Sequence, residues 1–100
     1  MNLLHAQVFT FKRMPLTPEQ VHALRSVPIG TMANKVRLAR TMLAITQTSV
    51  AEKVGLSSPQ LSDIERGEYK DIPLENGRDL AEFFGCAIED LFPVREALAS

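Results

Sequence analysis

The stretch of residues 46–67, TQTSVAEKVGLSSPQLSDIERG, constrains the fold of this chain more than any other part of the sequence. Apolar residues at helical spacing lie on both sides of Gly55, and glycine suits the left-handed residue that ends a helix. Thr46 is placed to cap the first helix, and Ser57, with Gln60 three residues later, has the spacing of a capping box. The stretch therefore predicts two short helices joined by a tight turn.

Helical spacing of apolar residues continues before this stretch. Residues 31–44 predict a helix capped by Thr31, with Lys35, Arg37 and Arg40 at polar positions. Its apolar stripe consists of Val36, Ala39, Met42 and Leu43. We therefore expect a first helix that runs from Thr31 through Ala44.

The pattern also continues after residue 67. Residues 74–84 predict a helix that ends at Gly85, and residues 88–92 predict a last short one. Gly77 in mid-helix costs about 1 kcal/mol relative to alanine, which indicates a close packing contact. A chain of 100 residues that is 45% hydrophobic can bury one modest core. We expect an all-α domain of five helices over residues 31–92.

Residues 1–30 precede this domain and are expected to form an N-terminal extension. Residues 8–13 are rich in β-formers and predict a short β-strand. Thr17 and Pro18 then suit the start of a short helix that runs to about Ser26. Residues 93–100 are expected to form a C-terminal tail.

The charge of the chain is divided unevenly. The formal net charge is −1, but residues 1–55 carry seven basic and two acidic side chains, whereas residues 56–100 carry four basic and ten acidic ones. Such polarity can present a positive face to phosphate while the acidic end points away, but charge alone favours ordinary surface chemistry as the explanation.

Several functional classes find no support in the sequence. Its apolar runs are too short to span a membrane, and its first residues do not resemble a secretory signal. Cys86 is the single cysteine, which suits a reducing cytoplasm and is expected to be buried and inert. His5 and His22 lie far apart without a nucleophile motif. We therefore expect a cytoplasmic protein that is not an enzyme and holds neither cofactor nor metal.

Residues 35–92 resemble the Cro/C1-type helix-turn-helix family, also called the xenobiotic-response-element regulators. The resemblance covers about three fifths of the chain and implies a lambda-repressor-like DNA-binding fold. The matching elements, in order, are Arg40, Ile45-Thr46-Gln47, Val50-Ala51, Lys53-Val54-Gly55-Leu56-Ser57, Leu61-Ser62-Asp63-Ile64-Glu65-Arg66-Gly67, Pro73-Leu74-Glu75, Leu80-Ala81, Phe84-Gly85 and Leu91-Phe92.

The resemblance implies roles for individual residues. Gln47 occupies the place of a glutamine that holds a DNA phosphate, and Arg66 and Lys70 lie where the family makes further phosphate contacts. Arg40 and Glu65 match an ion pair that mainly fixes helix orientation. The base-facing positions of the second helix of the motif are Ser58, Pro59, Gln60, Ser62 and Asp63.

These base-facing residues are unusual for a DNA reader. Pro59 offers only an apolar contact, for instance to a thymine methyl, and Asp63 can accept from a cytosine amino group but is repelled by phosphates. Gln60 either closes the capping box or pairs with a base, adenine being its natural bidentate partner. Affinity would then depend on phosphate contacts, and a single domain would bind weakly.

The resemblance and this weak surface together predict a transcriptional regulator, most simply a repressor, that binds double-stranded DNA as a homodimer on a two-fold operator. The alternative is an antitoxin or other protein-binding module, whose partner is a toxin or another regulator and whose DNA binding is secondary or lost. Residues 1–30 would either pair their strand across a dimer axis, bind such a partner, or form a flexible arm.

Overall fold

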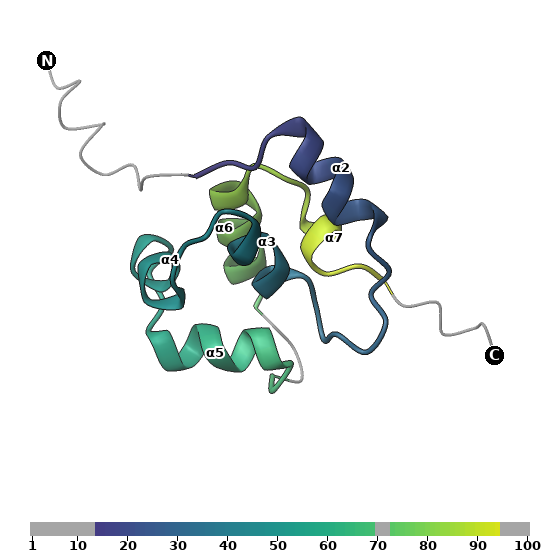
Figure 1. Ribbon diagram of the computed structural model, residues 1–100. Helices are drawn as coiled ribbons and strands as arrows, with labels where there is room; N and C mark the ends of the chain where they lie inside the picture. The colour runs from purple at the N-terminus through teal and green to yellow at the C-terminus, as the bar shows by residue number, and fades with distance from the viewer. Residues whose placement is uncertain (1–13, 70–72, 95–100) are drawn as a thin grey trace, which may run out of the picture.

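The computed structural model describes residues 14–69 and 73–94, and this part of the chain is all-α (Figure 1). It contains six helices and no strand. The β-strand predicted for residues 8–13 lies outside the described residues. The helices are α2 (Pro18–Ser26), α3 (Val36–Met42), α4 (Gln47–Lys53), α5 (Ser58–Arg66), α6 (Leu74–Phe84) and α7 (Ile88–Leu91). None of them is long and apolar enough to cross a membrane.

Helix α3 is shorter than its sequence pattern predicts, since it begins at Val36 and not at Thr31. The Asn34 side chain, just before the helix, hydrogen-bonds to the backbone at two places. Its Oδ1 accepts from the Val36 N–H at 3.0 Å, and its Nδ2 donates to the Ile64 carbonyl at 2.7 Å. Lys35, expected at a polar position, is only 5% exposed and donates from Nζ to the Leu24 carbonyl at 2.7 Å. The bond between Asn34 and Val36 is local, whereas the bonds to Ile64 and Leu24 join Asn34 and Lys35 to other helices, and α3 begins after these two residues.

The segment before α2 packs directly on α6. The backbone N–H groups of Met14 and Leu16 donate to the carbonyls of Phe83 and Phe84 at 3.1 and 2.9 Å. Gly85, which ends α6 at φ 65°, has no room for a side chain, because an added Cβ would lie 2.8 Å from Pro15. The chain at residues 14–16 is thus seated against the end of α6.

Helix α2 is joined to the rest of the domain by charged and apolar contacts. Leu24 is fully buried in the common core, and α2 contacts both α3 and α7. Arg25 donates from Nε and Nη2 to the two carboxylate oxygens of Asp90 at 2.7 and 3.1 Å. Because Asp90 also accepts from the Ala87 N–H at 2.9 Å, one carboxylate links α2 to the start of α7.

One hydrophobic core lies under all six helices. The rings of Phe83 and Phe84 meet edge to face at 5.0 Å between centroids, a favourable aromatic geometry. The close contact expected at Gly77 is present, because a Cβ added there would lie 3.3 Å from Ile88 Cδ1. The fully buried large side chains are Phe83, Phe84, Leu24, Leu61, Ile64, Leu80, Leu91, Val36 and Val50.

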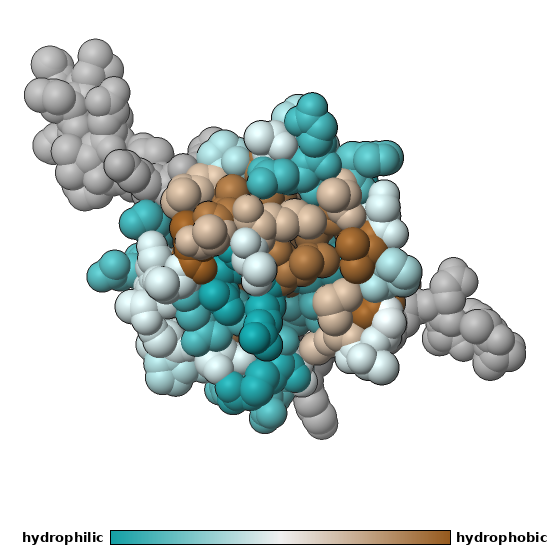
Figure 2. Space-filling model, in the orientation of Figure 1, coloured by the Kyte–Doolittle hydropathy of each residue, from teal (hydrophilic) through white to brown (hydrophobic). Residues whose placement is uncertain are grey.

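The arrangement leaves α4 and α5 together on one side of the domain, away from α2 and α7 (Figure 1). In the same view, a band of hydrophobic residues crosses the middle of the surface, with hydrophilic residues above it, over α2, and below it, over α5 (Figure 2). Partly exposed apolar side chains of α2 and α3 that pack against the core are Val21, Leu38 and Met42. Helices α4 and α5, which we call the α4–α5 unit, therefore lie on the hydrophilic side below the band.

Candidate nucleic-acid interface

Both helices of the α4–α5 unit start at the predicted caps. Thr46 Oγ1 accepts from the Ser49 N–H at 3.1 Å, and Ser57 Oγ accepts from the Gln60 N–H at 3.2 Å. Gly55 takes a left-handed conformation at φ 75° in the turn between them. Each cap of this kind stabilises its helix by about 1 kcal/mol. Local sequence signals thus fix where each helix of the unit begins.

Side-chain packing fixes the angle between the two helices. Val50 and Leu61 are fully buried between them and the rest of the core. At the surface, the Ser58 hydroxyl donates to Thr48 Oγ1 at 3.2 Å, which joins the first turn of α5 to α4. Pro59 and Gln60 are exposed on the outer side of α5, and Asp63 is 42% exposed. A rigid, polar helix face is therefore presented to solvent.

Gln60 takes part in the capping box. Its Oε1 accepts from the Ser57 N–H at 2.8 Å, so that oxygen is used inside the protein. Its Nε2 remains as a donor, and no described residue accepts from it. A bidentate contact to adenine needs both the oxygen and the nitrogen. With the box closed, Oε1 keeps one of its two lone pairs, and the free donor Nε2 suits the N7 of a purine or a carbonyl oxygen.

Arg40, Glu65 and Gln47 form one hydrogen-bonded group between α3, α4 and α5. Arg40 Nε and Nη2 donate to the two oxygens of Glu65 at 2.8 and 3.0 Å, and Arg40 Nη1 donates to the Ile45 carbonyl at 3.2 Å. Gln47 Nε2 donates to Glu65 Oε1 at 3.1 Å. The Glu65 side chain is 4% exposed, and its hydrogen bonds raise the pKa of Arg40 above its usual range. The group positions the Gln47 amide at the start of α4.

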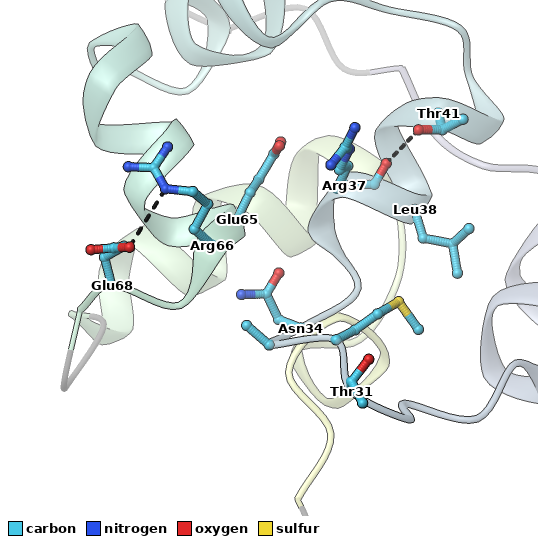
Figure 3. A pocket seen from close by; sticks show the side chains of 10 residues that line it. Thr31, Asn34, Arg37, Leu38, Thr41, Glu65, Arg66 and Glu68 are labelled. Atoms are coloured by element: carbon cyan, nitrogen blue, oxygen red, sulfur yellow. Dashed lines mark hydrogen bonds and ion pairs between the residues drawn. The ribbon is translucent and has the colours of Figure 1, made fainter.

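Arg66 is surrounded by partners from its own segment. It donates to Asp63 Oδ1 at 2.6 Å and to the Ser62 hydroxyl, and Glu68 lies 3.6 Å from its Nε. Figure 3 shows the Arg66–Glu68 pair at the edge of a surface depression of about 630 Å³. Lys70, expected to bind phosphate with Arg66, lies outside the described residues. The charge of Arg66 is therefore largely compensated within the chain.

Arg37 is a further basic residue of this region, and the sequence interpretation placed it only as a polar position of α3. Its side chain is exposed and extends from α3 toward the same side as that of Glu65 on α5 (Figure 3). It lines a cleft of about 300 Å³ together with residues of α3, α4 and α5. Its position one turn before Arg40 was the available sequence signal, because residues three apart share a helix face.

The groups that might suggest catalysis or metal binding are scattered. Cys86 is half-buried, and burial raises the pKa of its thiol to about 11. His22 is exposed on α2, and His5 lies outside the described residues. Within residues 14–69 and 73–94, no three His, Cys, Asp or Glu side chains are grouped so that they could hold a metal ion. The polar α4–α5 face is the chemically distinctive surface of the described chain.

Comparison with known proteins agrees with this geometry. The helix-turn-helix family profile matches residues 36–91, which is α3 through α7. An uncharacterised HTH-type transcriptional regulator of Methanocaldococcus jannaschii is 39% identical over 61 residues, covering 61% of this chain and 91% of that protein. The chain belongs to the Cro/C1-type helix-turn-helix family of DNA-binding transcriptional regulators, which is not a family of enzymes.

Proposed function

We propose that this protein is a cytoplasmic repressor that binds a two-fold operator as a homodimer, with α5 in the major groove. The observation that carries the proposal is the rigid α4–α5 unit, whose exposed outer face is polar. An α-helix fits the major groove, where its side chains can reach base edges. Occlusion of a promoter requires nothing beyond such a bound domain.

The proposed contacts divide between phosphates and bases. Gln47, whose amide is fixed by Glu65, and Arg66 and Lys70 would hold phosphates, which position the protein on the duplex. The base-facing residues would be Ser58, Pro59, Gln60, Ser62 and Asp63. Gln60 acts as a donor through Nε2, and Asp63 accepts from a cytosine amino group.

Dimer formation follows from the small contact surface. Asp63 and Glu68 compensate Arg66, so one domain offers few uncompensated cations to DNA. Two domains on one site bind far more tightly than either alone, because the second binding event is intramolecular. The hydrophobic band in Figure 2 supplies apolar surface that a second copy could cover.

Binding measured against genomic fragments and random DNA, at several salt concentrations, tests the proposal. We expect a small set of fragments to bind above random DNA, with a stoichiometry of two protein chains per site. Absence of any preference at low salt would contradict it. Preference with one chain per site would contradict only the dimer.

Substitutions at Gln60 separate base reading from helix capping. Gln60→Glu keeps an Oε1 for the capping box but removes the N–H donor, whereas Gln60→Ala removes both. We expect both variants to lose preference at one base position. Only Gln60→Ala should also lower stability. Retention of the preference in Gln60→Glu would exclude Gln60 as the reader of that base.

The second candidate function is a protein-binding module, such as an antitoxin, whose DNA binding is secondary or lost. The compensation of Arg66 by two acidic side chains favours it, because it weakens attraction to phosphate. Co-purification with the product of an adjacent reading frame, together with the absence of preferred DNA fragments, is the result expected for this function. Preferred fragments and no co-purified product would rule against it.

A further inference from the structure

A cleft of about 300 Å³ opens between α3, the start of α4 and the end of α5. Its walls contain three arginines, two neutral polar side chains and one glutamate. The lining residues are Arg37, Arg40, Gln47, Ser62, Glu65 and Arg66. The hydrogen bonds of each group show what kind of ligand this cleft can take.

The one carboxylate of the cleft already accepts three hydrogen bonds. Glu65 Oε1 accepts from Arg40 Nη2 and from Gln47 Nε2, and Oε2 accepts from Arg40 Nε. Arg40 compensates the charge of Glu65, and the Glu65 side chain is only 4% exposed. The negative charge of the cleft is therefore neutralised, and three of the acceptor positions of its carboxylate are occupied, so the cleft does not favour a cation.

Donors, in contrast, remain available. Gln47 Nε2 has two hydrogens, and Glu65 accepts one of them. The Ser62 oxygen accepts from Arg66 Nη1, which leaves its own hydrogen to be donated. The guanidinium of Arg37 has no acceptor or carboxylate partner among the described residues, and it supplies the cleft's uncompensated positive charge.

We propose that this cleft binds one phosphate of the DNA backbone, with Arg37 as the charged donor and Gln47 and Ser62 as neutral donors. The inference rests on the proposed DNA-binding function and deepens it. It adds Arg37 to the interface and assigns Ser62 to phosphate instead of a base edge. A phosphate in this position would lie beside α5, which forms one wall of the cleft.

Charge-matched variants provide the test. Arg37→Gln and Arg78→Gln each remove one positive charge, and Arg78 is exposed on α6 and does not line the cleft. Binding to a preferred fragment and to random DNA is measured by fluorescence anisotropy at several salt concentrations. Loss of one phosphate contact should lower the slope of log affinity against log salt by about 0.9. We expect this change, with about tenfold weaker binding of both DNAs, in Arg37→Gln only.

Two further variants sharpen the assignment. Arg37→Lys keeps the charge and should restore the salt slope, although not the full affinity of the planar guanidinium. Ser62→Ala should weaken binding to all sequences alike, because a phosphate contact carries no sequence information. A change of base preference in Ser62→Ala would return Ser62 to the base-facing set and overturn its place in the cleft.

The outcomes separate the cleft from the overall function. If wild-type protein binds preferred DNA and Arg37→Gln behaves like Arg78→Gln, the cleft assignment is overturned and the DNA-binding function stands. If wild-type protein binds no DNA, both are overturned. Titration with inorganic phosphate tests the alternative that the cleft binds a free phosphate ion and not a phosphate of DNA. Arg37-dependent binding of inorganic phosphate that equals the affinity for duplex would show a site for a free anion and overturn the assignment to the DNA backbone.

Discussion

Glu65→Ala is the substitution that most directly tests how the α4–α5 unit is held. Glu65 accepts three hydrogen bonds, two from Arg40 and one from Gln47, and its side chain is 4% exposed. Removing one partner of a buried ion pair costs about 3–5 kcal/mol. The Arg40 side chain is 16% exposed in the intact protein, and its bond to the Ile45 carbonyl does not involve Glu65. We therefore expect a loss in the free energy of unfolding at the lower end of this range, about 3 kcal/mol.

The loss is measured by urea and thermal unfolding at neutral pH, followed by circular dichroism. About 3 kcal/mol corresponds to a fall in Tm of roughly 12–24 °C for a domain of this size. Glu68→Ala is the matched control, since that glutamate is 58% exposed and its removal should cost less than about 0.5 kcal/mol.

A double-mutant cycle with Arg40→Ala completes the test. The combined variant should be more stable than the sum of the two single losses predicts, with a coupling of about 1–3 kcal/mol, because the second substitution removes the orphaned charge. Strict additivity, or a Glu65→Ala protein as stable as the Glu68→Ala control, would refute the view that this buried group orients the unit.

Three further predictions concern stability and reactivity. The hydrogen bonds from Arg25 hold the pKa of Asp90 below its usual range. The stabilisation of the fold by ionised Asp90 is therefore complete above the unfolded-state pKa of about 3.9 and is lost as pH falls through the lower folded-state pKa. The free energy of unfolding in urea, measured from about pH 6 to pH 2, should fall more steeply for wild type than for Asp90→Asn. Ala44 adopts φ 55°, so Ala44→Gly should raise stability by about 0.5–1 kcal/mol in thermal unfolding, whereas Ala23→Gly inside α2 should lower it. Burial raises the pKa of Cys86 to about 11, so Ellman's reagent should modify it far more slowly in native protein than in urea at about pH 8, and equal rates would contradict its burial.

The helices whose boundaries depend on local residues were predictable. Thr46, Ser57, Gly67 and Gly85 cap or end α4, α5 and α6 at the predicted positions, because each cap uses a side chain or a backbone conformation within a few residues. The predicted start of α3 at Thr31 was wrong in part for the opposite reason. Asn34 accepts from the nearby Val36 N–H, but Asn34 and Lys35 also donate to the Ile64 and Leu24 carbonyls, and a local pattern contains no record of those partners.

The interface shows the same limit. The spacing of Ser57 and Gln60 predicted the capping box, which is present. The sequence could not show that Gln60 Oε1 bonds the Ser57 N–H while Nε2 stays free, because this follows from the orientation of the amide in the structure. Arg37, which we propose as an interface residue, was not identified from the sequence. The lack of a hydrogen-bond partner for its guanidinium among the described residues is known only after the helices have been packed.

The structure also shows how the charge of the acidic residue on the exposed face of α5 is balanced. Asp63 alone would repel phosphates, but Arg66 lies one turn later and pairs with it at 2.6 Å. The exposed face of α5 is thereby close to neutral, and among the described residues that line the adjacent cleft, Arg37 on α3 is the uncompensated cation. In our proposal, base reading resides on α5, and Arg37 adds its charge to the phosphate contacts of Arg66 and Lys70. Substitutions on the outer face of α5 that spare the Asp63–Arg66 pair would then change the preferred sequence without changing the salt dependence, whereas Arg37→Gln would lower the salt dependence for every sequence alike.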